Sequence, residues 1–198
     1  MGITTNITGQ FGISSFVVSS VPGQAQFTSI QAAIDAAEAA GGGSIYIYPG
    51  IYLENLTMPN ADISIAASPA DVQVIGACVH HATSSIKITG IGFTNSAGNA
   101  WIIGNSGFED SDIEFINCDI TSTNDTAIVC TSSVGTANLK LTNSSVSGIF
   151  SAVDYSDGQG VFTGSTLTSV GTGGPYECVQ MKASAQVISN NNFLGCVS

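Results

Sequence analysis

The stretch Ile113-Glu-Phe-Ile-Asn117-Cys-Asp-Ile120 alternates apolar and polar residues on either side of one asparagine. The same pattern returns at four other places, with Gly or Asn at its centre: 86–93, 139–146, 160–167 and 186–193. The central residues follow one another at steps of 27, 26, 21 and 26 residues: Gly90, Asn117, Asn143, Gly164 and Asn190. A period in the twenties with strand-like alternation is typical of a solenoid, in which each repeat buries its apolar face against its neighbours.

A second apolar segment lies between successive copies of this stretch. It begins at equivalent residues spaced by 27, 25 and 26 positions: Ala100, Ala127, Ala152 and Cys178. One coil therefore contains three short strands, and the central Gly or Asn marks a sharp bend that requires a positive φ. Stacked Asn side chains at this bend are expected to hydrogen-bond along the axis. The pattern predicts an all-β, single-stranded right-handed parallel β-helix with three faces.

One segment near the N-terminus, about residues 28–40, has helical periodicity. Thr28 is the expected N-cap and Gln31 its capping-box partner. The apolar residues recur at helical spacing on one face: Ile30, Ala33, Ile34, Ala37 and Ala40. Such a helix is expected to cover the first coil of a β-helix domain that spans 27–198, whereas 1–26 form an N-terminal arm or a partial first rung.

Composition excludes several classes of partner. Of 198 residues only 9% are charged, and three lysines with no arginine leave a net charge of −11. Nucleic acid is not an expected partner, because phosphate binding needs clustered Lys and Arg. Anionic membranes and polyanionic glycans are disfavoured for the same reason. No apolar run has the length of a membrane span, so membrane insertion is not expected.

The five cysteines show no spacing typical of metal ligands, and we expect them to act as small buried apolar residues. Their positions in the coil do not form one column, which argues against a disulfide ladder. No secretory signal is visible at the N-terminus, because no basic region precedes an apolar stretch. We expect no cofactor.

Three segments carry a resemblance to a known family. Residues 27–54, which include Gly43-Ser-Ile-Tyr-Ile-Tyr-Pro-Gly50, resemble the N-terminal cap and first coil of pectin methylesterases. Ile88-Thr-Gly-Ile-Gly-Phe-Thr-Asn-Ser-Ala-Gly98 is similar to a second landmark of that family, and 117–126 lie where it has a Gln-Asp-Thr motif. The resemblance covers about residues 27–165 and implies the fold of the pectin-lyase-like superfamily.

In those esterases, two aspartates one coil apart serve as nucleophile and general acid/base. The resemblance matches Asp125 to the first aspartate, and Asp154 to the second only after a local shift of the alignment. By the spacing of the repeats, Asp125 aligns with Phe150 instead. The family also places an arginine beside its carboxylates, and this chain has none. An intact esterase site is therefore not expected, and turn formation is the alternative role for Asp125.

A polysaccharide lyase is the second enzymatic alternative. It needs clustered carboxylates for Ca²⁺ and a basic residue to remove a proton. Glu109, Asp110 and Asp112 do cluster, but no base accompanies them, and such a cluster is more often a solvated loop. His80 and His81 are adjacent, and adjacent residues on a strand face opposite sides, which argues against a shared metal ion. A place in a loop is the alternative for the pair.

Three residues are candidates for contact with a glycan. Trp101 and Tyr155 lie on the strand that carries active sites in the superfamily, and Asn124 precedes the matched aspartate. A place in the core is the alternative for both aromatic residues.

The last copy of the repeat ends near the C-terminus, and no second capping segment follows it. An open end exposes unpaired strand edges, so we expect self-association as a trimer or by end-to-end stacking. These observations favour a non-catalytic structural or adhesive protein of a virion, tail fibre or extracellular filament, with polysaccharide as an expected contact. The alternative is a carbohydrate-active enzyme of the esterase or lyase type with an atypical site. Either function predicts an extracellular or virion-associated protein.

Overall fold

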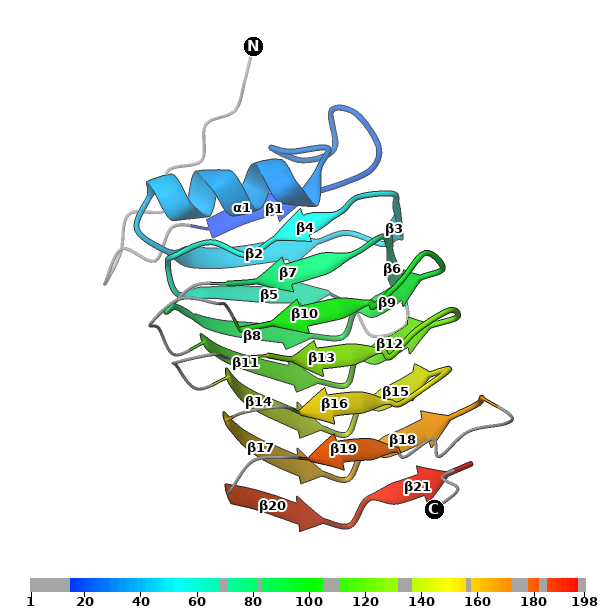
Figure 1. Ribbon diagram of the computed structural model, residues 1–198. Coiled ribbons are helices and arrows are strands. Elements are labelled where there is room, and N and C mark those ends of the chain that lie inside the picture. The colour runs from blue at the N-terminus through cyan, green and yellow to red at the C-terminus, as the bar shows by residue number, and fades with distance from the viewer. Residues whose placement is uncertain are drawn as a thin grey trace.

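The computed structural model describes residues 15–67, 71–81, 83–104, 111–131, 137–155, 158–171, 178–181 and 185–195. The chain winds into a solenoid of stacked coils, with one helix at its N-terminal end (Figure 1). Residues 1–14 of the predicted N-terminal arm lie outside the described residues, but β1 (Ser15–Val18) within it is a strand paired with the first full coil.

All the described strands belong to three parallel sheets. Sheet A contains β1, β2 (Gly43–Ile47), β5 (Ile63–Ala67), β8 (Ser85–Thr89), β11 (Ser111–Ile116), β14 (Ala137–Thr142), β17 (Gly158–Thr163) and β20 (Ala185–Ser189). Sheet B contains β3 (Gly50–Tyr52), β6 (Val72–Ile75), β9 (Gly92–Asn95), β12 (Asp119–Ser122), β15 (Ser145–Gly148), β18 (Thr166–Ser169) and β21 (Asn192–Leu194). Sheet C contains β4 (Leu56–Thr57), β7 (Cys78–His80), β10 (Trp101–Ile103), β13 (Ile128–Cys130), β16 (Val153–Tyr155) and β19 (Val179–Met181).

The register confirms the repeats that the sequence predicts. Phe115 pairs with Ile88 in the preceding coil and with Leu141 in the following one, so equivalent apolar residues stack. Side chains alternate between the interior and the solvent along each strand. The core is therefore a continuous apolar column, and Phe93, Trp101 and Phe115 pack edge to face within it, with ring centroids 5.0 to 6.2 Å apart.

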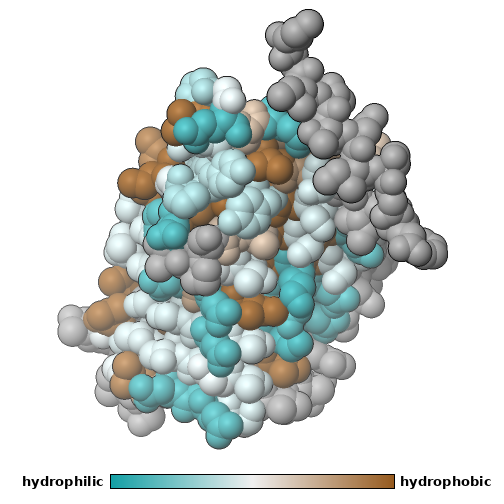
Figure 2. Space-filling view, turned by 180° about the vertical axis from the view of Figure 1, so that it is seen from behind, coloured by the Kyte–Doolittle hydropathy of each residue, from teal (hydrophilic) through white to brown (hydrophobic). Residues whose placement is uncertain are grey.

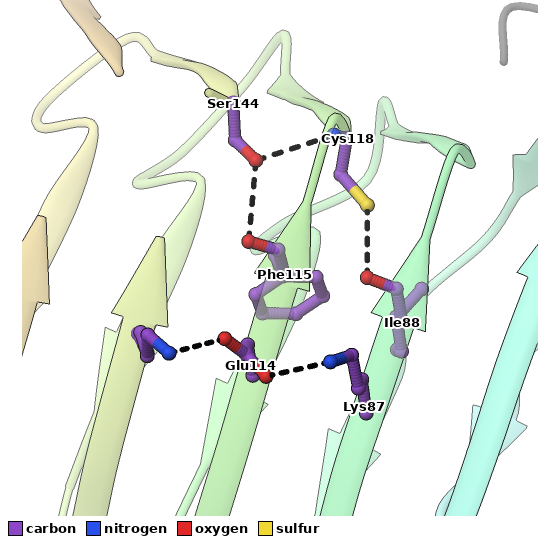
Figure 3. A network of polar contacts seen from close by, with 7 residues as sticks. Lys87, Ile88, Glu114, Phe115, Cys118 and Ser144 are labelled. Carbon is purple, nitrogen blue, oxygen red and sulfur yellow. Dashed lines mark hydrogen bonds and ion pairs between the residues drawn. The ribbon is translucent and has the colours of Figure 1, made fainter. Parts of the chain in front are cut away.

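The bend between sheets A and B confirms the predicted backbone conformation. The three asparagines at the bend have φ between 49° and 54°, and Gly90 and Gly164 have φ of 75° and 60°. The predicted stack of Asn amides is replaced by contacts of the residue that follows each bend. The Cys118 amide donates to Ser144 Oγ at 3.2 Å (Figure 3). In the next coils, the Ser144 amide donates to Ser165 Oγ (3.1 Å) and the Ser165 amide to Asn191 Oδ1 (2.8 Å).

Helix α1 (Ile30–Ala39) covers the N-terminal end of the core with four buried side chains: Ile30, Ala33, Ile34 and Ala37. Its N-cap is Ser29, one residue after the predicted Thr28, because Ser29 is extended and its hydroxyl accepts from the Ala32 amide. The predicted capping box is absent here. Glu54 instead accepts from the first two helical amides, at 2.9 and 3.0 Å. Ala40 is the C-cap and is exposed, contrary to its predicted place on the buried face.

Gln31 has a different role from the one the capping box assigns to it. Its side-chain amide accepts from the Thr57 amide (2.8 Å) and donates to the Thr57 carbonyl (3.1 Å). These are the two hydrogen bonds that another strand would make to β4. The helix thus satisfies the first edge of sheet C and shields it from pairing with another chain.

Cysteines fill the core, as predicted, at three positions: Cys78, Cys118 and Cys130 are buried and free. Burial raises the pKa of each of these thiols, so they stay protonated. Cys178 departs from the prediction, because it forms a disulfide whose partner lies outside the described residues. Among the helices of the described chain, none is long and apolar enough to cross a membrane.

Candidate functional site

The outer face of sheet C is where the resemblance places catalytic chemistry. Its outward positions are mostly aliphatic, with Val79, Ile102 and Val129 stacked in successive coils. Asp154 follows Val129 in this column. The Oδ1 atom of Asp154 is buried and has no hydrogen-bond partner among the described residues, and the neighbour in the preceding coil, Val129, offers none.

Asp125 lies in the turn between β12 and β13, and its carboxylate is engaged locally. Its Oδ1 accepts from the Thr126 amide at 2.7 Å, and its own amide donates to Ser122 Oγ at 2.9 Å. Since Ile128 pairs with Val153, Asp125 aligns with Phe150, four residues before Asp154. The structure thus places the two predicted aspartates in adjacent coils but at different positions along them.

The three predicted glycan contacts lie in different environments. Trp101 is fully buried against Phe93 and Phe115, which excludes it as a platform for a sugar and leaves the core role. Asn124 is exposed in the same turn as Asp125. The backbone of Tyr155 pairs with Cys130 and Met181, but its side chain lies outside the described residues.

The predicted Ca²⁺ cluster is described only in part, because Glu109 and Asp110 lie outside the described residues. Asp112 belongs to β11 and accepts from the Asn138 side-chain amide at 2.6 Å. His80 is buried, its Nε2 lies 3.1 Å from the Ser84 carbonyl, and burial lowers its pKa, whereas His81 is exposed. In the part of the chain that is described, no three His, Cys, Asp or Glu residues gather as a metal site.

The outer face of sheet A carries a charged group that the sequence analysis did not single out. Glu114 lies between Lys87 and Lys140 on three neighbouring strands and contacts them at 3.4 and 2.5 Å (Figure 3). The hydrogen bond from Lys140 lowers the pKa of Glu114, so the carboxylate stays ionised. Both lysine side chains are about half exposed, at 50% and 53%. A signal was present in the sequence, since these are the second residues of three successive repeats.

Two depressions flank this group on the outer face of sheet A. One, of about 450 Å³, extends from the end of α1 across β2 and β5 to Lys87. The other, of about 250 Å³, extends from β8 across Glu114 and Lys140 to Val161. Ser85 lines both. Figure 2 shows this face, on which strongly hydrophilic side chains lie among weakly hydrophilic ones and smaller hydrophobic patches. We refer to the two depressions together as the axial groove.

Comparisons with known proteins support the fold. The sequence matches no family model and no curated protein. The structure is similar to that of YbhC from Escherichia coli, with 17% identity, a TM-score of 0.63, and coverage of 86% of this chain and 58% of YbhC. It is also similar to a pectin methylesterase from Aspergillus niger, with 12% identity, a TM-score of 0.51, and coverage of 90% and 85%. This chain therefore has the pectin-lyase-like parallel β-helix fold, and it spans less than two thirds of YbhC.

Proposed function

We propose that this protein binds polysaccharide without catalysing esterase chemistry. The observation that carries the proposal is the state of Asp125, whose carboxylate is hydrogen-bonded within its own turn and is offset by four positions from Asp154. Two carboxylates divide the work of nucleophile and general acid only when both reach the same reacting group. The chain also has no arginine to stabilise a developing negative charge.

Two observations support a carbohydrate as the ligand. The fold is shared with a pectin methylesterase from Aspergillus niger. Only 9% of the residues in the sequence are charged, and the polar residues are mostly ones with hydroxyl or amide groups. Such side chains suit ligands that present many hydroxyls.

A second candidate function is an esterase centred on sheet C. Asp154 favours it, because the Oδ1 atom of this carboxylate is buried without a donor and the aliphatic Val129 lies beside it in the preceding coil. An incompletely paired carboxylate in such surroundings is suited to proton transfer or nucleophilic attack. The chain would then need another group in place of the second aspartate.

Release of methanol from methyl-esterified pectin separates the two candidates. We expect no release above the blank from the wild-type protein, from Asp154→Asn or from Asp125→Asn. Methanol release by the wild type that Asp154→Asn abolishes would establish the esterase and overturn the proposal. If the wild type releases methanol and only Asp125→Asn abolishes the release, with an unchanged urea midpoint, the proposal is also overturned. The local hydrogen bond of Asp125 would then be compatible with catalysis.

We also propose that copies of the chain associate, and that the protein serves a structural or adhesive role in a virion, tail fibre or extracellular filament. Support comes from β21, where Phe193 and Leu194 are 43% and 45% exposed in contrast to the buried Leu167 of the preceding coil. Light scattering tests the association, and a monomer at all concentrations contradicts it.

A further inference from the structure

We propose that the axial groove on sheet A binds a neutral, linear glycan whose chain runs along the solenoid axis. This inference rests on the proposed function and names its site, which differs from the sheet C face where the resemblance places catalysis. Four features support it: the direction of the groove, its hydrogen-bonding groups, the aromatic side chains near one end and the balance of charge.

The groove has the direction and length for a chain-like ligand. Its two depressions share Ser85 and together cross β2, β5, β8, β11, β14 and β17, which are successive neighbours in sheet A. Neighbouring strands lie about 4.8 Å apart, so the path from Ser64 on β5 to Lys140 on β14 is roughly 14 Å. A ligand that follows the groove therefore contacts one coil after another. A polymer suits such a path, because its own units also repeat along one direction.

The side chains on this path offer both donors and acceptors. Lys87 and Lys140 each carry three N–H donors, and their contacts with Glu114 leave further donors directed to solvent. Next to them, Asp112 and Asn138 form a hydrogen-bonded pair across β11 and β14. Sugar hydroxyls donate and accept at once, and they therefore suit a row in which donors and acceptors alternate.

Two tyrosines lie beside the N-terminal end of the groove. Tyr46 and Tyr48 are each 40% exposed, and their rings meet edge to face with centroids 5.6 Å apart. Tyr46 follows Ser44, which lines the groove, by two residues on the same face of β2, and it pairs with the small residue Ala66 on β5. An exposed aromatic ring beside small neighbours offers an apolar surface on which the apolar face of a sugar ring packs.

The balance of charge favours a neutral glycan over a uronate polymer. Three carboxylates line the groove, at Asp62, Asp112 and Glu114, against the two ammonium groups of Lys87 and Lys140. The chain as a whole carries −11. A polyanion would thus meet net repulsion both in the groove and over the rest of the surface.

Affinity electrophoresis in native gels tests the proposal, with gels that contain hydroxyethylcellulose, xyloglucan, galactomannan or polygalacturonate. We expect at least one neutral polymer to retard the wild-type protein and polygalacturonate to leave its mobility unchanged. The double variant Tyr46→Ala/Glu114→Gln should weaken the retardation constant about tenfold, the size of effect typical of a central binding residue. Asp119→Asn, an exposed position on sheet B, removes the same charge as Glu114→Gln and should bind like the wild type.

The outcomes separate the site from the function. If a neutral polymer retards the wild type and the double variant equally, the axial groove is not the site, although polysaccharide binding stands. If no polymer retards the wild type, both the site and the proposed function fail. Retardation by polygalacturonate alone overturns the neutral ligand. Equal urea midpoints of the variants and the wild type confirm that weakened retardation reflects lost contacts rather than unfolding.

Discussion

The bend between sheets A and B and the turn between sheets B and C change the direction of the chain by different means. At the first, one residue with positive φ is followed by a side chain that accepts from the preceding coil, as with Asn143 and Ser144. At the second, the length varies: four residues separate Ser122 from Ala127, but three separate Gly148 from Ala152. The hydrogen bonds that hold the turn vary too. Ser122 Oγ donates to the Gly98 carbonyl of the preceding coil, whereas Gly148, at the equivalent position of the next coil, has no side chain to do so.

The difference shows how a solenoid keeps its register while its surface changes. The bend is uniform from β8 onward, so that the strands of sheets A and B keep their register there and Phe115 stacks on Ile88 and Leu141. The variable turn carries Asn124 and Asp125, and its length decides how such residues align with those of the next coil. Chemistry can therefore vary at this turn without a change in the core.

Gly148→Ala should give the largest effect, because it tests the shorter turn. A β-carbon at Gly148 would lie 2.0 Å from the Ser151 carbonyl oxygen and 2.8 Å from the Ala127 amide nitrogen, both of the backbone. The shorter turn thus brings a carbonyl to the place that a side chain occupies in the neighbouring coils. We expect a loss of about 3 kcal/mol in the free energy of unfolding, measured from the urea midpoint.

Gly98→Ala is the matched control for this variant, since it lies in the longer turn of an earlier coil. A β-carbon at Gly98 meets no atom within 4 Å. Its urea midpoint should stay near that of the wild type. Equal destabilisation by both alanines would show that the close approach of Ser151 is not the cause.

Asn143→Val tests the uniform bend and should have the next largest effect. Asn143 has φ of 49°, a region in which a β-branched residue is strained by about 2 kcal/mol. Asn143→Gly adopts this conformation freely and should leave the urea midpoint close to that of the wild type. If valine and glycine are tolerated equally, the positive φ is not what the asparagine contributes.

The contrast between bend and turn also explains what the sequence could predict. The positive φ at Asn117 or Gly90 follows from a local preference, and the repeat showed where it falls. The N-cap was wrong by one residue because Thr28 and Ser29 are both good caps, and Glu54, distant in sequence, contacts Ser29 and the first helical amides. Three strands per coil followed from the spacing, since equivalent residues do pair in parallel.

The candidate site was harder to predict. Side chains alternate between core and solvent along the short strand that holds Trp101, so a shift of one residue in its predicted start moves Trp101 from one side to the other. The sequence alone did not determine that start. The alignment of Asp125 with Phe150 came from counting the repeat and agrees with the register. The group formed by Lys87, Glu114 and Lys140 needed only the observation that equivalent positions stack.

Ser144→Ala should have the smallest effect of the three stability variants, and it tests the other half of the uniform bend. Ser144 Oγ accepts from the Cys118 amide at 3.2 Å and lies 3.0 Å from the Thr142 carbonyl, to which it donates. Alanine fits the site sterically but leaves the Cys118 amide without this acceptor. We expect a loss of about 1 kcal/mol in the free energy of unfolding. Ser145→Ala is the control, since the next side chain is exposed on sheet B. If the two variants have the same urea midpoint, the contacts along the axis contribute nothing measurable, and the positive φ of the preceding residue alone stabilises the bend.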